Sequence, residues 1–207
     1  MIFSSLEFVF FFLPIVLGVF FAIGSSGAHT LALAWLTLAS LFFYSYWNPK
    51  YLFLILISIG INYAIGLCIQ SFKSRSLRFS KALMVLGVIF NVGLLGYYKY
   101  VNFLVENLNA IAGTDIVIKQ IILPLGISFF TFQQIAYIVD VYRGHITDNN
   151  FLRYCLFVTF FPQLIAGPIV HHDEVMPQFA QQDILKPNAR AIAIGITIFT
   201  IGLGVVA

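Results

Sequence analysis

The sequence predicts an all-α membrane protein: a polytopic bundle of transmembrane helices, some of them broken or re-entrant, around an internal cavity. Of its 207 residues, 60% are hydrophobic and only 9% are charged. Soluble domains carry roughly 25% charged residues, so this chain cannot cover a soluble surface. Several apolar runs approach the 20 residues of a membrane-spanning helix. Proline, glycine and glutamine interrupt two of these runs, and irregular backbone at membrane depth is tolerated only where protein buries it or water wets it.

We interpret residues 1–207 as a single transmembrane domain with seven apolar segments. They lie near residues 8–23, 30–47, 51–69, 82–98, 121–141, 151–170 and 191–207. A signal peptide is the alternative for the first segment, but its start carries Glu7 and neither Lys nor Arg. Pro14 is expected to kink this first helix.

The second and third segments are separated by a turn. The second ends in the aromatic cluster Tyr44, Tyr46 and Trp47, which is typical of a membrane–water interface. The turn Asn48-Pro49-Lys50 follows. Asn62 lies near the middle of the third segment and should face protein, because an unpaired amide in hydrocarbon costs roughly 2–7 kcal/mol.

The most basic loop of the chain, residues 70–81, sets the expected orientation. It carries Lys73, Arg75, Arg78 and Lys81. The positive-inside rule places such a loop in the cytoplasm, so the N-terminus should be extracytoplasmic. The net charge of +3 is small and arises mostly from this loop, which indicates orientation and argues against nucleic-acid binding.

An amphipathic segment follows the fourth apolar run, which has Asn91 in its interior. Between residues 101 and 112, Val101, Leu104, Leu108 and Ile111 recur at helical spacing. This pattern predicts an interfacial helix on the outer surface of the membrane.

The stretch from Leu123 to Phe179 departs most from a plain membrane span. Pro162 and the pair Gly167-Pro168 predict a broken or re-entrant helix within 151–170. Asp140 and Arg143 are spaced for an ion pair at a helix end.

The same stretch contains the candidate site residues Gln133, Gln134, Gln163, His171 and His172. For the three glutamines, helix-to-helix hydrogen bonding, worth about 0.6 kcal/mol, competes with lining a substrate path. For the two histidines, a polar loop at the interface competes with a substrate-path role. A metal site is disfavoured, because consecutive residues point to different faces. Cys68 and Cys155 are expected to be buried free thiols.

Two motifs carry a resemblance to a known family. The runs LPLGISFFTFQQIAYIVDVYRG and FVTFFPQLIAGPIVHHDEVMPQF resemble the membrane-bound O-acyltransferase family. They are most similar to its bacterial branch, which acts in alginate O-acetylation and D-alanyl transfer to teichoic acid. The opening MIFSSLEFVFFFLPIV and the segment SYWNPKYLFLILISIGINY resemble the same branch, and FFPQLIAGPI is the most specific element.

The resemblance implies transfer of an acetyl or other short acyl group to a hydroxyl. The donor would be a cytoplasmic thioester, acetyl-CoA or an acyl carrier, acting as a co-substrate with no bound cofactor. The acceptor would be an exported polysaccharide, as in alginate O-acetylation, reached through an extracytoplasmic acetyltransferase partner or directly. The protein would lie in the lipid of the bacterial inner membrane. A hydroxyl needs a positioned base at neutral pH, and a histidine suits this task because its unperturbed pKa is about 6.5.

No catalytic residue is assigned within the chain. The family's catalytic histidine stands in a later apolar segment, in a Trp-His-Gly-like setting. The histidines here, His29, His145, His171 and His172, lack that setting. We therefore expect the catalytic histidine after Ala207 and interpret the chain as the N-terminal part of a longer enzyme, inactive alone. The alternatives are a transporter or flippase, built on broken helices, and an inactive membrane scaffold.

Overall fold

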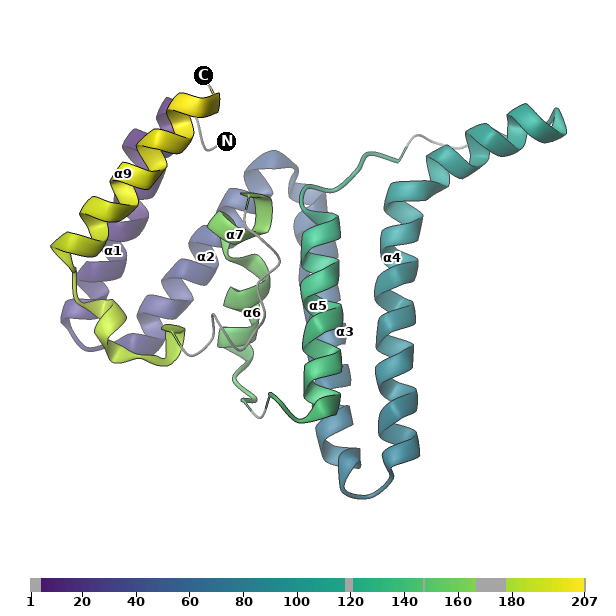
Figure 1. The fold of residues 1–207 in the computed structure, drawn as a ribbon, viewed down its shortest axis with the longest axis horizontal. Coiled ribbons are helices and arrows are strands. Elements are labelled where there is room, and N and C mark those ends of the chain that lie inside the picture. Colours follow the sequence, from purple (N-terminus) through teal and green to yellow (C-terminus); the bar gives the residue numbers. More distant parts are fainter. Residues whose placement is uncertain (1–4, 118–120, 147, 167–177, 207) are drawn as a thin grey trace.

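A computed structural model of the chain describes residues 5–117, 121–146, 148–166 and 178–206. Every secondary-structure element in these ranges is a helix, which confirms the predicted all-α class (Figure 1). Three helical stretches are long and apolar enough to cross a membrane: Phe8–Ser25, Pro49–Lys73 and Leu77–Ala112. Large apolar side chains, among them Phe53, Ile57 and Leu86, are exposed on the outer faces of these helices. The protein is therefore a membrane protein whose exposed apolar faces suit contact with lipid.

The first helix is distorted where the sequence places proline. Residues Phe8–Phe12 form a π-helical turn, η1, in which the Leu13 N–H bonds to the Phe8 carbonyl, and α1 (Leu13–Ser25) continues from it. In a regular α-helix the ring of Pro14 would clash with the carbonyl four residues earlier. The wider π-turn accommodates this ring, so the expected distortion at Pro14 takes the form of a π-turn.

Two short connections join α2, α3 and α4. Asn48 ends α2 (His29–Trp47) and caps α3 (Pro49–Lys73), because its side chain accepts from the Lys50 N–H at 3.1 Å and Pro49 occupies the first turn. Ser76 caps α4 (Leu77–Ala112) in the same way. Helices α3 and α4 therefore form a hairpin.

Helix α4 is longer than predicted. Its 36 residues span about 54 Å, well beyond the roughly 30 Å of a hydrocarbon core. The helix expected over 101–112 is the last third of α4 rather than a separate helix, because no proline interrupts the backbone after the fourth apolar run. Figure 1 shows that these last turns bend away from α3 and α5.

Helix α5 (Ile127–Arg143) lies at the centre of the bundle and packs against α3, α4, α6 and α7. Two glycines with left-handed backbone bound it: Gly126, with φ 66°, and Gly144, with φ 89°. The apolar run predicted from residue 121 is not helical until Ile127, since Pro124 and Gly126 turn the chain before the helix starts.

The second apolar run of this region is a broken helix, as predicted. Helix α6 (Phe151–Thr159) ends at Phe160, whose ψ of 107° leaves the helical region, and α7 (Phe161–Ala166) follows. A continuous helix would direct the Pro162 ring into the carbonyl four residues earlier, whereas the first turn of a new helix has room for it. Gly167, Pro168, His171 and His172 lie outside the described residues.

The described chain ends with a 3₁₀ turn, η2 (Gln182–Leu185), and α9 (Ala189–Val206). Figure 1 shows α9 alongside α1, and the ring centroids of Phe199 and Phe8 are 6.5 Å apart. The two ends of the described chain therefore lie close together.

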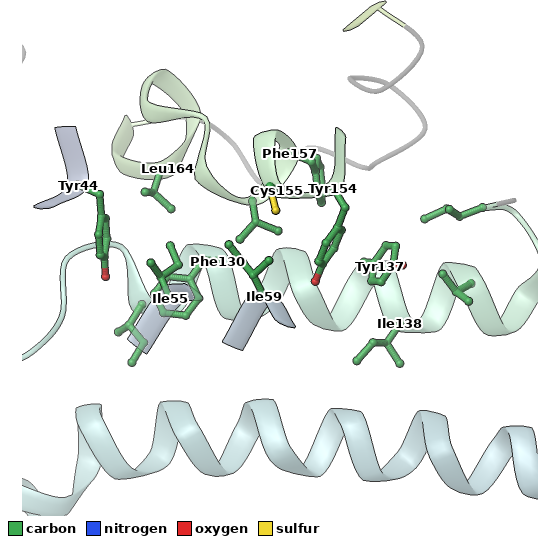
Figure 2. Close-up of a cluster of buried hydrophobic side chains, with 14 of the residues drawn as sticks. Tyr44, Ile55, Ile59, Phe130, Tyr137, Ile138, Tyr154, Cys155, Phe157 and Leu164 are labelled. Carbon is green, nitrogen blue, oxygen red and sulfur yellow. The ribbon is translucent and has the colours of Figure 1, made fainter. Parts of the chain in front are cut away.

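Two hydrophobic clusters lie on either side of α6. The first joins α3, α5 and α6 through residues such as Ile59, Phe130 and Tyr154 (Figure 2). The second joins η1, α1 and α2 through residues such as Phe8 and Phe43. Helix α6 supplies Phe157 to the first cluster and Leu156 to the second, so it holds the two halves of the bundle together.

Candidate functional site

A pocket of about 440 Å³ lies where the broken helix meets α1 and α2. The break at Phe160 frees its carbonyl, which accepts from the N–H groups of Gln163 and Leu164 at 3.0 and 2.9 Å. The Phe161 N–H donates to the Ser40 hydroxyl of α2 at 3.4 Å. These bonds hold α7 against α2 and place Gln163 at the pocket wall.

The pocket is apolar, and it has a buried amide in its wall. Gln163 is only 8% exposed, and its Nε2 has no hydrogen-bond partner among the described residues. An unpaired N–H group in an apolar wall favours a ligand that brings an acceptor oxygen. Apart from Gln163 and Gln178, the lining side chains are Leu13, Val16, Leu17, Phe20, Phe21, Leu36, Phe160, Phe161, Pro162, Phe179 and Ile184. The arrangement suits a short hydrocarbon group bearing a carbonyl.

Gln134 belongs to a different place, a buried network of polar side chains between α3, α4 and α5. Its Oε1 accepts from the Ser58 hydroxyl at 2.9 Å and from Asn62 Nδ2. Asn62 also exchanges hydrogen bonds with Asn91 of α4, and each asparagine donates to the carbonyl four residues earlier in its helix. None of these four side chains is more than 1% exposed. The prediction that Asn62 faces protein is therefore confirmed.

The three candidate glutamines do not form one site. Gln133 is buried on α5, its Oε1 has no partner among the described residues, and it does not line the pocket of Gln163. Gln134 makes hydrogen bonds between helices, which is the first of the two roles expected for the glutamines. Only Gln163 of the three lines this pocket.

Two further expectations from the sequence are wrong. Asp140 lies 3.8 Å from His145 rather than pairing with Arg143, since the left-handed Gly144 turns the chain back so that the His145 N–H bonds the Asp140 carbonyl. Cys68 is exposed on the outer face of α3, whereas Cys155 is buried as expected.

The described histidines and acids do not gather into a metal site. Within the described ranges, no three His, Cys, Asp or Glu side chains lie close enough to share an ion. His29 instead ties α2 to the segment before η2, because its Nε2 lies 2.9 Å from the Phe179 carbonyl. Phe179, held by this contact, is one of the residues that line the pocket.

Sequence reasoning missed two parts of these sites. The residues of α1 and η2 that line the pocket are apolar. Their sequence does not distinguish them from apolar residues that face lipid. Ser58 was also missed, although its spacing of four from Asn62 places both on one helix face and could have indicated it.

Comparison with known proteins identifies two kinds of relative. The chain is 42% identical, over 98% of its length, to the peptidoglycan O-acetyltransferase of Helicobacter pylori, of which it covers 43%. It is 40% identical, over 86% of its length, to the probable alginate O-acetylase AlgI of Pseudomonas aeruginosa, of which it covers 34%. The chain thus spans less than half the length of these relatives. No family model and no solved structure matches it.

Proposed function

Since this chain is a relative of the bacterial O-acetyltransferases of the membrane-bound O-acyltransferase type, we propose that it takes part in O-acetylation. An acetyl or other short acyl group moves from a thioester donor on the cytoplasmic side to a hydroxyl of an exported polysaccharide. In the net reaction the carbon–sulfur bond of the donor breaks, the glycan hydroxyl oxygen bonds to the acyl carbon, and the hydroxyl proton ends on the released thiol. The observation that carries the proposal is the 42% identity over nearly the whole chain.

The pocket beside α7 supports this proposal. Its apolar walls fit the hydrocarbon part of an acyl group, and a rotation of the buried, unpaired Gln163 amide would present its Nε2 to the acyl carbonyl. Gln163 therefore acts as a positioning residue on the acyl path. The donor is a co-substrate, acetyl-CoA or an acyl carrier.

What the two relatives share supports a proposal for the acceptor class. One is named for peptidoglycan and the other for alginate, both of which are sugar polymers with free hydroxyls. We infer a glycan hydroxyl as the acceptor, the inner membrane as the location, and an extracytoplasmic acetyltransferase as a partner that delivers the group.

Deletion of the gene in its native bacterium tests the proposal. Ester-linked acetate is released from isolated cell-surface polysaccharide by mild base and measured. We expect the acetate to fall in the deletion strain and to return when the intact gene is restored. Unchanged acetate in every surface polysaccharide would refute the function.

The role of Gln163 is tested by Gln163→Leu in the restored gene. The change keeps the side-chain volume and removes the N–H donor, so polysaccharide acetate should fall several-fold at unchanged protein level. Gln181→Leu is the control, because Gln181 is exposed and outside the pocket. Equal acetate in both strains would remove Gln163 from the acyl path while leaving O-acetylation intact.

A further inference from the structure

The C-terminal third of α4 and the segment that returns from it form a projecting arm, which we define as residues 101–117. Figure 1 shows this arm bending away from α3 and α5 at the end of the bundle opposite the loop of residues 74–76. Its helix ends at Ala112, and Gly113, with a left-handed φ of 63°, caps the helix and reverses the chain. No other described element covers the far end of the arm in this view.

Two asparagines fasten the return of the chain to one face of the arm. Asn109 Nδ2 donates to the Ile116 carbonyl at 2.9 Å, and its Oδ1 accepts from the Ile116 N–H at 3.0 Å. Asn102 makes the same pair of bonds with the backbone of Ile121, at 2.8 and 3.2 Å. Asn102 and Asn109 are seven residues apart and lie on one face, so the polar face of the arm is taken up by its own chain.

The remaining face of the arm is apolar and uncovered. Leu104, Leu108 and Ile111 follow the spacing of a helical stripe, and their exposed fractions are 59%, 50% and 86%. Phe103 beside them is 61% exposed. Such a stripe requires an apolar partner.

This stripe continues the outer face of the membrane-spanning part of α4. Leu86 and Leu104 are separated by five helical turns, as are Val85 and Phe103, so each pair lies on one side of the helix. All four side chains are exposed on the side of α4 away from its helix partners. Figure 1 shows that the arm bends away from α3 and α5, toward the outer side of α4. If that outer side meets lipid along the span, the bend turns the same side of the arm toward the bilayer.

The charges of the arm decide how it would meet a membrane. Residues 101–117 contain Glu106 and Asp115 and neither lysine nor arginine. Anionic headgroups attract basic residues, and the nearest lysines, Lys99 and Lys119, flank the arm in the sequence, so residues 101–117 themselves supply no electrostatic attraction to lipid. Burial of the apolar stripe is the remaining source of affinity.

We propose that the arm is a lipid-docking element that lies in the interface of the leaflet opposite loop 70–81. Its stripe of Phe103, Leu104, Leu108 and Ile111 enters the boundary between headgroups and acyl chains. Docking depends on apolar burial and is independent of lipid charge.

The test places a fluorescent probe on each face of the arm in the full chain. Leu108→Cys carries the probe on the stripe, and Glu106→Cys carries it on the opposite face, in a background in which Cys68 and Cys155 are alanine. The protein is reconstituted in nanodiscs whose phosphatidylcholine bears a nitroxide near the headgroup end of the acyl chain. We expect at least about twofold stronger quenching at position 108 than at position 106. The quenching should be the same with and without phosphatidylglycerol.

Other outcomes overturn the proposal. Equal quenching at both positions means that the arm does not lie on lipid by its stripe. A requirement for phosphatidylglycerol means that charge holds it. A probe at position 108 that is neither quenched by lipid nor reached by aqueous iodide is covered by protein instead. Phe103→Cys repeats the measurement on the same face if Leu108→Cys does not fold.

Discussion

Asn62 shows how a single polar side chain organises the interior of an apolar bundle. Its Nδ2 lies within hydrogen-bond distance of Gln134 and Asn91, and its own Oδ1 accepts from Asn91. A buried amide that loses its partners costs more than the bond itself contributed, since the remaining groups are left unpaired. The amides of α3, α4 and α5 therefore fix which faces of these helices meet.

Asn62→Ala should lower the free energy of unfolding by about 1–3 kcal/mol, because Asn91 and Gln134 each lose a buried partner. Unfolding of the detergent-solubilised chain with increasing SDS, followed by circular dichroism, measures this change. Asn107→Ala is the control, since its side chain is exposed and bonds only within its own helix. Similar losses for both variants would contradict a structural role for the network.

For a single residue, the sequence predicts whether the side chain is buried better than it predicts which side chain it bonds to. The amide of Asn62 is too costly to leave in hydrocarbon, so its inward direction could be foreseen. Which side chain it meets depends on the rotation of α4 and α5, and composition does not carry that information. Cys68 illustrates the same limit, because a thiol suits both a core and a lipid-facing surface.

The start of α5 and the short helix α7 depend on each other through Gly126. A Cβ atom on Gly126 would come within 2.9 Å of the Leu164 carbonyl, and the φ of 66° already disfavours a side chain there. The glycine lets the backbone of α5 approach α7 closely enough to keep Gln163 at the pocket wall.

Gly126→Ala should therefore displace α7 and destabilise the chain more than Gly113→Ala does. Both glycines have left-handed backbone, which costs an alanine roughly 1–2 kcal/mol, but no atom lies within 4 Å of a Cβ built on Gly113. Thermal unfolding of the two purified variants measures the difference. A matching loss of stability would show that the α7 contact contributes nothing.

The steric effect of Pro162 made the break between α6 and α7 predictable. The continuity of α4 could not be predicted. Pro162 excludes one straight helix for a local steric reason that any structure must obey. The amphipathic pattern of residues 101–112 looks the same in a separate interfacial helix and in the extension of a longer one. The two cases differ only in whether the backbone stays helical after the fourth apolar run.

Six of the eleven basic residues lie at or near one end of the bundle, whereas Lys50 and Lys99 lie toward the other end. The α3–α4 connection carries Arg75, and the end of α5 and the start of α6 carry Arg143 and Arg153. Figure 1 shows these helix ends at the same side, opposite the arm. The distribution follows the positive-inside rule for a cytoplasmic end.

Reporter fusions test this orientation. A reporter that is active only outside the cytoplasm should be inactive at residue 75 and active at residue 114, since α4 lies between the two sites. The reverse pattern would invert the topology of the whole bundle. A cytoplasmic fluorescent reporter at the same two positions is the control for expression.

For the whole molecule, composition predicts an all-α membrane bundle, and the family resemblance predicts its relatives. The division of the core into two clusters could not be predicted, because phenylalanine and isoleucine suit a core and a lipid-facing surface equally. The pocket beside α7 is lined mainly by residues of the second cluster, so its walls share the same ambiguity.

The α3–α4 hairpin also bears on how the chain is made. The ribosome completes Asn62 and Asn91 before it reaches Gln134, and only the short turn at residues 74–76 separates their helices. The two asparagines can therefore pair as the hairpin leaves the translocon, so that neither enters lipid alone. Helix α5 would then pack against both helices of the hairpin, with Gln134 as the last member of the network to arrive.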